Sequence, residues 1–206
     1  MLAIENEIKQ QGFNLVIGVD EAGRGPLAGP VVATAVALKE DQFTCKITDS
    51  KKISPRQREI AFQEIMDKAY VGVGIMNESI IDRMNILQAS FLAMRNAVEA
   101  LIVRVPEVPE DMDARKGDIC LLIDGNQFKT DLPYAFRTIV KGDASVLSIA
   151  CASIVAKVIR DRIICIYDDI FPEYGFRQHK GYPTVKHKQA LREYGPSLIH
   201  RRSFKY

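Results

Sequence analysis

Five apolar stretches alternate with polar segments along the 206-residue chain and predict the strands of a sheet. They cover residues 16–20, 31–38, 70–76, 120–124 and 135–140. The first three of these strands come early in the chain, with a single predicted helix among them, and we expect them to pair antiparallel.

Helical periodicity and capping residues predict the other elements. Ser54 and Pro55 are a typical N-cap and first helical residue. The predicted helices cover residues 56–69, 79–83, 85–103, 146 to about 167 and 185–194. Strands therefore dominate the first part of the chain and helices the second. This order predicts an α/β fold, a mixed five-stranded sheet flanked by helices.

Length and composition predict one globular domain over residues 1–206, with a helical and loop-rich C-terminal part from about residue 168. Hydrophobic residues make up 47% of the chain and charged residues 26%, which is ordinary for a soluble protein. The N-terminus has charges where a signal peptide needs an apolar core. The longest nearly apolar run, 146–156, is shorter than the roughly 20 residues that cross a bilayer. We expect a cytoplasmic protein with no membrane partner.

The four cysteines, Cys45, Cys120, Cys151 and Cys165, are scattered along the chain without a C-x-x-C pair. This spacing is typical neither of a zinc site nor of a disulfide framework. We expect reduced thiols, most of them packed in the interior.

Charge is distributed unevenly along the chain. Residues 177–206 hold eight Lys or Arg and one acid, a local charge of +7, whereas the preceding 176 residues carry −5. A basic end on an acidic body suggests a surface that binds a polyanion. A solvated basic tail would explain the charge about as well.

Acidic residues stand at or just beyond the ends of three predicted strands. Asp20 and Glu21 close the first, Asp124 closes the fourth, and Asp143 follows the fifth. A single acid at such a place is commonly a turn former or a cap, but open α/β sheets also place their sites at strand ends. Clustered carboxylates raise one another's pKa values, and divalent cations remove that repulsion. Oxygen ligands without His or Cys suit Mg²⁺ or Mn²⁺, and two such ions about 4 Å apart commonly promote displacement at phosphorus.

Seven motifs stand in order along the chain: VDEAGRGPLAGPVV, TDSKK, LIDGN, VKGD, ASIVAKVIRDR, QHKGYPT and HRRSF. Bacterial ribonuclease HII carries these motifs in the same order, and the chain resembles that family from about residue 15 to residue 204. The resemblance implies the ribonuclease H-like fold and an endoribonuclease with two metal ions, Mg²⁺ or Mn²⁺. It implies cleavage of the RNA strand of RNA–DNA hybrids and nicking 5′ to ribonucleotides embedded in duplex DNA. The products would carry 3′-hydroxyl and 5′-phosphate ends.

The resemblance also assigns roles to individual residues. The catalytic metal ligands match Asp20, Glu21, Asp124 and Asp143. The turn Gly23-Arg24-Gly25 matches the backbone that contacts the ribonucleotide and its 2′-hydroxyl, the group that distinguishes RNA from DNA. Tyr182 matches the ring that stacks beside that sugar and senses the RNA-to-DNA junction.

Several residues are candidates for phosphate contact, which positions a duplex without reading its sequence. They are Ser50, Lys51, Lys52, Lys157, Lys180, Arg201 and Arg202. For any one lysine a solvated surface position is about as common.

Other polar residues near the motifs receive no catalytic role. Asp161 lies four residues after Lys157, so a helix-surface ion pair explains it better than catalysis. Asp49 is interpreted as loop or cap chemistry beside Ser50 and Lys51. The three histidines, His179, His187 and His200, have no partner at metal-ligand spacing.

Two alternative functions differ in class from a ribonuclease. One is a non-catalytic nucleic-acid-binding module, which the presence of all four carboxylates disfavours. The other is a recombination nuclease on the same fold, which the Gly23-Arg24-Gly25 turn and Tyr182 disfavour. We expect a monomer whose partner is an RNA–DNA hybrid or a DNA duplex with an embedded ribonucleotide. Residues 104–118 favour an exposed loop, and 106–116 a surface insertion longer than in other family members.

Overall fold

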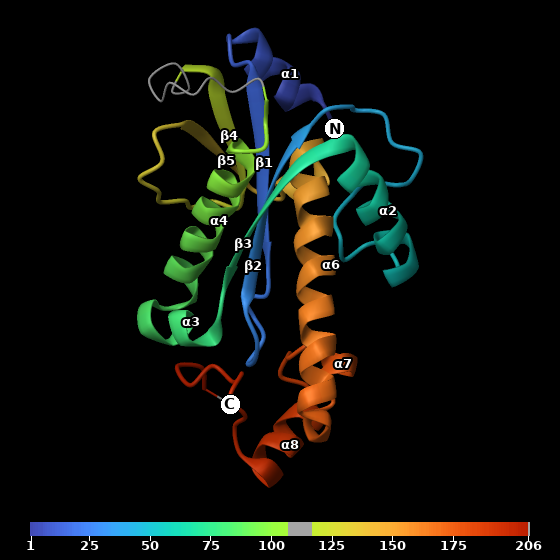
Figure 1. The fold of residues 1–206 in the computed structure, drawn as a ribbon, viewed down its shortest axis with the longest axis vertical. Helices are drawn as coiled ribbons and strands as arrows, with labels where there is room; N and C mark the ends of the chain where they lie inside the picture. The colour runs from blue at the N-terminus through green and yellow to red at the C-terminus, as the bar shows by residue number, and fades with distance from the viewer. Residues whose placement is uncertain (107–116, 206) are drawn as a thin grey trace.

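The computed structural model describes residues 1–106 and 117–205, and their centre is a five-stranded sheet (Figure 1). The strands are β1 (Leu15–Ala22), β2 (Val31–Leu38), β3 (Ala69–Met76), β4 (Ile119–Asp124) and β5 (Ala135–Ile139), in the spatial order β3-β2-β1-β4-β5. β2 is antiparallel to both β1 and β3, whereas β4 is parallel to both β1 and β5. The predicted mixed sheet with antiparallel first strands is confirmed.

The helices agree with the sequence pattern over most of the chain. They are α1 (Ala3–Gln10), α2 (Pro55–Lys68), α3 (Glu78–Met84), α4 (Ile86–Ile102), α6 (Leu147–Ile170), α7 (Phe176–His179) and α8 (Val185–Tyr194), with 3₁₀ turns η1 (Gly142–Ala144) and η2 (Pro172–Tyr174). The Ser54 hydroxyl accepts from the Gln57 N–H, and the Gln57 side chain accepts from the Ser54 N–H, which completes a capping box on α2. The sequence pattern did not indicate α1, α7 or the two 3₁₀ turns.

Helices cover both faces of the sheet, with α3 and α4 on one side and α2 and α6 on the other (Figure 1). Alternate residues of a strand point to opposite faces, and the core follows this rule. Ile17 of β1 and Leu121 of β4 belong to the core under α4, whereas Val16 and Leu122 belong to a cluster with Ile149 of α6. Both faces are therefore apolar, which explains why the central strands have nearly continuous hydrophobic sequences.

Glycines in the strands allow the helices to approach the sheet closely. A Cβ atom at Gly18 of β1 would lie 2.3 Å from the Ser148 carbonyl carbon and 2.4 Å from the Ile149 nitrogen of α6. Gly72 and Gly74 of β3 allow the same approach by α4. The contact at Gly18 fixes α6, which carries Lys157, against β1, which carries Asp20 and Glu21.

The C-terminal part packs around the second half of α6 and against the connection between β1 and β2 (Figure 1). Leu27 and Ala28 of that connection share an apolar cluster with Ile164 of α6 and Phe176 of α7. An isolated β-bridge joins Ala28 to His200. The C-terminal part therefore contacts the turn that contains the predicted glycine motif. The assignment of the whole chain to one domain stays a prediction.

Three further expectations concern the surface and the thiols. In the part of the chain that the structure describes, no helix is both long and apolar enough to cross a membrane. All four cysteines are free, Cys120 and Cys151 being buried, as predicted. The predicted surface insertion 106–116 lies outside the described residues except for Pro106.

We expect Gly18→Ala to lower the free energy of unfolding by about 1–3 kcal/mol, because its methyl group would overlap the α6 backbone. Urea denaturation measures the change. Gly117→Ala is the matched control, since a Cβ atom there meets no atom within 4 Å. Equal stability of the two variants would show that α6 shifts away from β1 at little cost.

Candidate active site

The parallel pairing of β1 with β4 brings the predicted acids to one end of the sheet. Val19 and Ile123 are register partners, so the next residues, Asp20 and Asp124, lie side by side where the two strands end. The Gly142 N–H donates to Asp124 Oδ1 at 2.8 Å and so attaches η1, which carries Asp143, to the end of β4. Glu21 follows Asp20 within β1. Four carboxylates from distant parts of the sequence therefore share one region.

Burial and, after it, repulsion between the acids disfavour their charged forms. Burial, then the charges of Glu21 and Asp124, raise the pKa of Asp20 well above its ordinary value. Burial also raises the pKa of Glu21, an effect that Arg24 opposes and Asp124 reinforces. The pKa of Asp143 is raised by burial, by Asp124 and by Asp49.

The chemistry of these side chains fits a hard divalent cation, because every donor is a carboxylate oxygen and a cation would offset their mutual repulsion. Within residues 1–106 and 117–205, however, no three His, Cys, Asp or Glu side chains are arranged closely enough to hold a metal ion. The role of Asp20, Glu21, Asp124 and Asp143 as metal ligands therefore stays a prediction.

A cavity of about 600 Å³ lies next to these acids, and Glu21 forms part of its wall. Seven of the predicted substrate contacts line it: Gly23, Arg24, Gly25, Ser50, Lys51, Lys157 and Tyr182. The structure thus brings together residues that the sequence separates by more than 150 positions. Their contacts with a substrate stay predictions.

The glycine turn and the tyrosine form one wall of the cavity. Gly23 has φ of +106°, a conformation that glycine adopts readily and other residues do not. A Cβ atom at Gly25 would lie 3.4 Å from Tyr182 Cε1, so the tyrosine ring lies against the turn. The Tyr182 side chain is also partly exposed, as a ring that stacks on a substrate must be.

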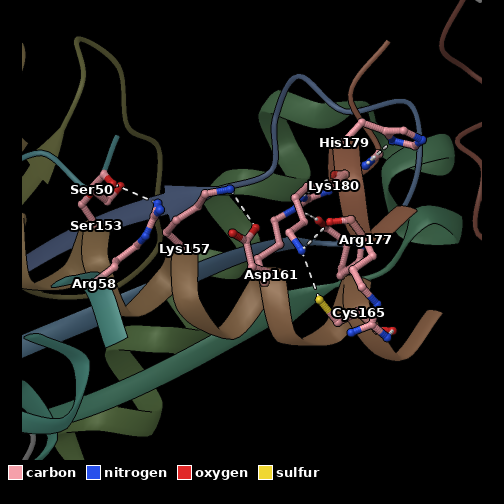
Figure 2. Close-up of polar contacts among 12 residues, drawn as sticks. Ser50, Arg58, Ser153, Lys157, Asp161, Cys165, Arg177, His179 and Lys180 are labelled. Atoms are coloured by element: carbon pink, nitrogen blue, oxygen red, sulfur yellow. Dashed lines mark hydrogen bonds and ion pairs between the residues drawn. The ribbon is translucent and has the colours of Figure 1, made fainter. Parts of the chain in front are cut away.

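Hydroxyl and basic groups also line the cavity (Figure 2). The Ser50 and Ser153 hydroxyls are 3.0 Å apart, and Arg58 Nη1 donates to the Ser50 carbonyl at 2.9 Å. Sequence reasoning missed Arg58 and Ser153 as members of the site. Ser153 stands in the ASIVAK motif, which was a usable signal, whereas Arg58 lies in a charged helix that offered none.

The interpretation of Asp161 as an ion-pair partner is confirmed, because Lys157 Nζ lies 2.7 Å from Asp161 Oδ1 (Figure 2). Burial lowers the pKa of Lys157, and Asp161 opposes that shift. Asp49 likewise has the predicted loop role, since its Oδ1 accepts from the Lys51 N–H at 3.0 Å.

Two of the predicted phosphate contacts point elsewhere. Lys180 Nζ donates to Cys165 Sγ and to the Arg177 carbonyl, so it lies along α6 and outside the cavity wall (Figure 2). Arg201 is fully buried, and within the described part of the chain its side chain donates to backbone carbonyls, so its prediction as a phosphate contact was wrong. Arg202 is exposed, in contrast. The charge pattern could not distinguish a buried arginine from an exposed one.

His187 and His200 form a buried hydrogen-bond network that ends at the Tyr182 carbonyl. The Ser197 N–H donates to His200 Nδ1, which leaves His200 Nε2 as the donor to His187 Nε2 at 2.9 Å. His187 Nδ1 then donates to the Tyr182 carbonyl at 2.9 Å. Both rings are neutral in this arrangement. Burial, followed by the repulsion that would arise if His187 were also protonated, lowers the pKa of His200 to about 4.

Solved structures identify the class of fold. A chain in the structure of the PCNA:RNase HII complex from Archaeoglobus fulgidus is similar with a TM-score of 0.72 and 23% identity, over 93% of this chain and 96% of that one. The ribonuclease H2 from Pyrococcus horikoshii OT3 is similar with a TM-score of 0.66 and 26% identity, over 93% and 94% of the two chains. The fold is therefore the ribonuclease H-like class of nuclease folds, as predicted.

Sequence comparison identifies the family within this class. The sequence model described as Ribonuclease HII matches residues 17–206. Ribonuclease HII of Geobacter metallireducens is 49% identical over 98% of this chain and 88% of that protein, and the enzyme of Chlorobium chlorochromatii is 45% identical over 95% and 91%. The chain belongs to the ribonuclease HII family and is a ribonuclease.

The buried histidine pair predicts a pH dependence of stability. Unfolding exposes His200, whose pKa then returns from about 4 to an ordinary value near 6.5, so the unfolded chain binds more protons between these values. Stability is therefore retained above pH 6.5 and lost as pH falls, by about 2 kcal/mol between pH 7 and pH 5.

Urea denaturation of the wild type and of His200→Gln at both pH values measures this effect. The variant does not titrate there but keeps a donor within reach of His187. The expected result is a smaller loss for the variant. A parallel loss in both proteins would contradict a neutral His200 in the folded state.

Proposed function

We propose that this chain cleaves the RNA strand of RNA–DNA hybrids and nicks duplex DNA on the 5′ side of an embedded ribonucleotide. The reaction is phosphodiester hydrolysis with two divalent ions, Mg²⁺ or Mn²⁺, and it leaves 3′-hydroxyl and 5′-phosphate ends. The observation that carries the proposal is the position of the four acids beside a cavity that combines the glycine turn, Tyr182 and basic groups. Membership of the ribonuclease HII family supports ribonuclease H activity on hybrids.

In this proposal Asp20, Glu21, Asp124 and Asp143 hold the ions. Their repulsion in the absence of a cation supports that role, as does the absence of softer ligands from the set. A similar chain is also known in complex with Mn²⁺, that of Bst-RNase HIII, at 18% identity and a TM-score of 0.57. Bound divalent ions supply charge stabilisation to the attacking and leaving oxygens of an in-line displacement.

The other residues bind and orient the nucleic acid. Gly23, Arg24 and Gly25 present backbone to the ribose, where a 2′-hydroxyl distinguishes RNA from DNA. Tyr182, whose ring lies against Gly25, stacks beside the same sugar. Ser50, Lys51 and Lys157 contact phosphates, which fixes the position of the duplex without selecting a sequence.

A duplex DNA with one ribonucleotide tests the proposal directly. We expect a single nick 5′ to that ribonucleotide with Mg²⁺ or Mn²⁺, and none with EDTA, because the carboxylates need a cation to act on phosphate. Denaturing electrophoresis resolves the products, and an all-DNA duplex is the control. A nick that survives EDTA would refute the metal-dependent mechanism, and no nick with either metal would refute ribonucleotide recognition.

Asp124→Asn tests the predicted ligand set. Asp124 interacts electrostatically with each of the other three acids. Its loss should therefore lower the rate of hybrid cleavage by about 10³-fold or more, while binding of the duplex persists. Rates and fluorescence anisotropy in Ca²⁺ report the two quantities. Asp131→Asn is the matched control, because Asp131 is exposed and pairs with Arg95. Equal loss in both variants would remove Asp124 from the site.

A further inference from the structure

Two arginines lie buried beneath the glycine turn. Arg160 of α6 is 1% exposed and Arg201 of the C-terminal segment is 0% exposed. Among the described residues neither forms an ion pair with an acid, although buried guanidinium groups are normally paired with one. Their donors are instead satisfied by backbone carbonyls, which is the feature that needs a physical explanation.

Among the described residues, the side-chain hydrogen bonds of Arg201 all go to one segment. Arg201 donates to the carbonyls of Gly23 at 2.6 Å, Arg24 at 3.1 Å, Pro26 at 2.8 Å and Gly29 at 2.9 Å. These four carbonyls face inward around a single guanidinium group. The outer side of the Gly23–Gly25 turn is thereby left to face the cavity.

Arg160 binds two segments at once. Its Nε and Nη2 donate to the carbonyls of Pro30 at 3.0 Å and Ala28 at 3.1 Å, beyond the glycine turn. Its Nη1 donates at 3.0 Å to the carbonyl of Lys180, two residues before Tyr182. One rigid, planar group thus sets the distance between the turn and the tyrosine segment. A backbone bond from the Leu27 N–H to the Gly181 carbonyl, at 2.8 Å, joins the same two segments.

Close packing adds to these hydrogen bonds. A Cβ atom at Gly23 would lie 2.2 Å from Arg160 Nε, so the turn rests directly on the guanidinium group. Burial lowers the pKa of Arg160 to about 10 and that of Arg201 to about 9, and both remain charged at neutral pH. Their positive charge lies under a turn that a phosphate backbone would approach.

We propose that Arg160 is a positioning residue that holds the glycine turn and Tyr182 at the spacing needed to recognise an RNA-to-DNA junction. Arg201 shapes the glycine turn alone. This inference rests on the proposed function, because it explains how two recognition elements of that site keep their relative position. A substrate with one ribonucleotide presents its sugar and the junction together, so it needs both elements in register. A continuous hybrid can be cut at positions with no junction and depends on the spacing less.

The test compares two duplexes of the same sequence, one with a single ribonucleotide and one with a continuous RNA strand, in Mn²⁺. For Arg160→Met and Arg160→Lys we expect kcat/KM to fall about tenfold more on the single-ribonucleotide duplex than on the hybrid, because a small displacement of a positioned group can cost this much. Arg160→Lys keeps the charge and the packing of the stem but cannot serve three carbonyls, and it covers the case in which Arg160→Met does not fold.

Two further variants separate positioning from a general loss of stability. Arg201→Lys alters a guanidinium group of equal burial and should lower kcat/KM by a similar factor on both duplexes. Glu5→Ala removes a buried group that fastens α1 to α6 at Ser148, far along the helix, and should leave the ratio unchanged. Equal losses on both duplexes for the Arg160 variants, or none, would overturn the inference. Failure of the wild type to nick at a single ribonucleotide would instead refute the proposed function.

Discussion

The candidate site depends on the parallel pairing of β1 with β4. These strands are about a hundred residues apart in sequence, and their register puts Asp20 beside Asp124. β5 continues the sheet in the same direction, and the turn after it returns to Asp124 through the Gly142 N–H. A shift of β4 by one residue would turn Asp124 to the other face of the sheet. Such a shift would also exchange the close-packed side chains of β4 between the two cores, so the packing of the core specifies the position of the acids.

The acids make the end of the sheet electrostatically unfavourable, and the surrounding cations only partly offset this. Arg24 favours the charged form of Glu21, and Lys51 and Lys52 favour that of Asp143. At Asp20 burial dominates, and none of the described lysines or arginines contributes comparably. The fold therefore retains a concentration of negative charge that a divalent cation would relieve, beside a cavity that basic groups also line.

Much of this arrangement could be predicted from the sequence, for identifiable reasons. The five strands and the longer helices have strong periodicity, and α8 has the predicted boundaries because Thr184 caps it and Gly195 ends it. The seven substrate residues were found through motifs, and the structure gathers them at one cavity. α1 was missed because its eight residues are mostly polar, and tertiary contacts at Glu5 and Ile8 hold it. Arg58 was missed because only the fold brings α2 to the cavity.

The basic C-terminal part shows most clearly why charge along a sequence is an incomplete guide. Its excess of lysine and arginine suggested one surface for a polyanion, yet its cations have different surroundings. Arg202 is exposed, Lys180 lies along α6, and Arg201 is enclosed by the carbonyls of the glycine turn. An arginine that binds carbonyls acts on a ligand only through the backbone that it shapes. The fold thus places charged residues on both sides of one turn, acids where β1 ends and guanidinium groups beneath the loop that follows. The few residues from Asp20 to Gly25 connect the acids to the turn that the guanidinium groups hold.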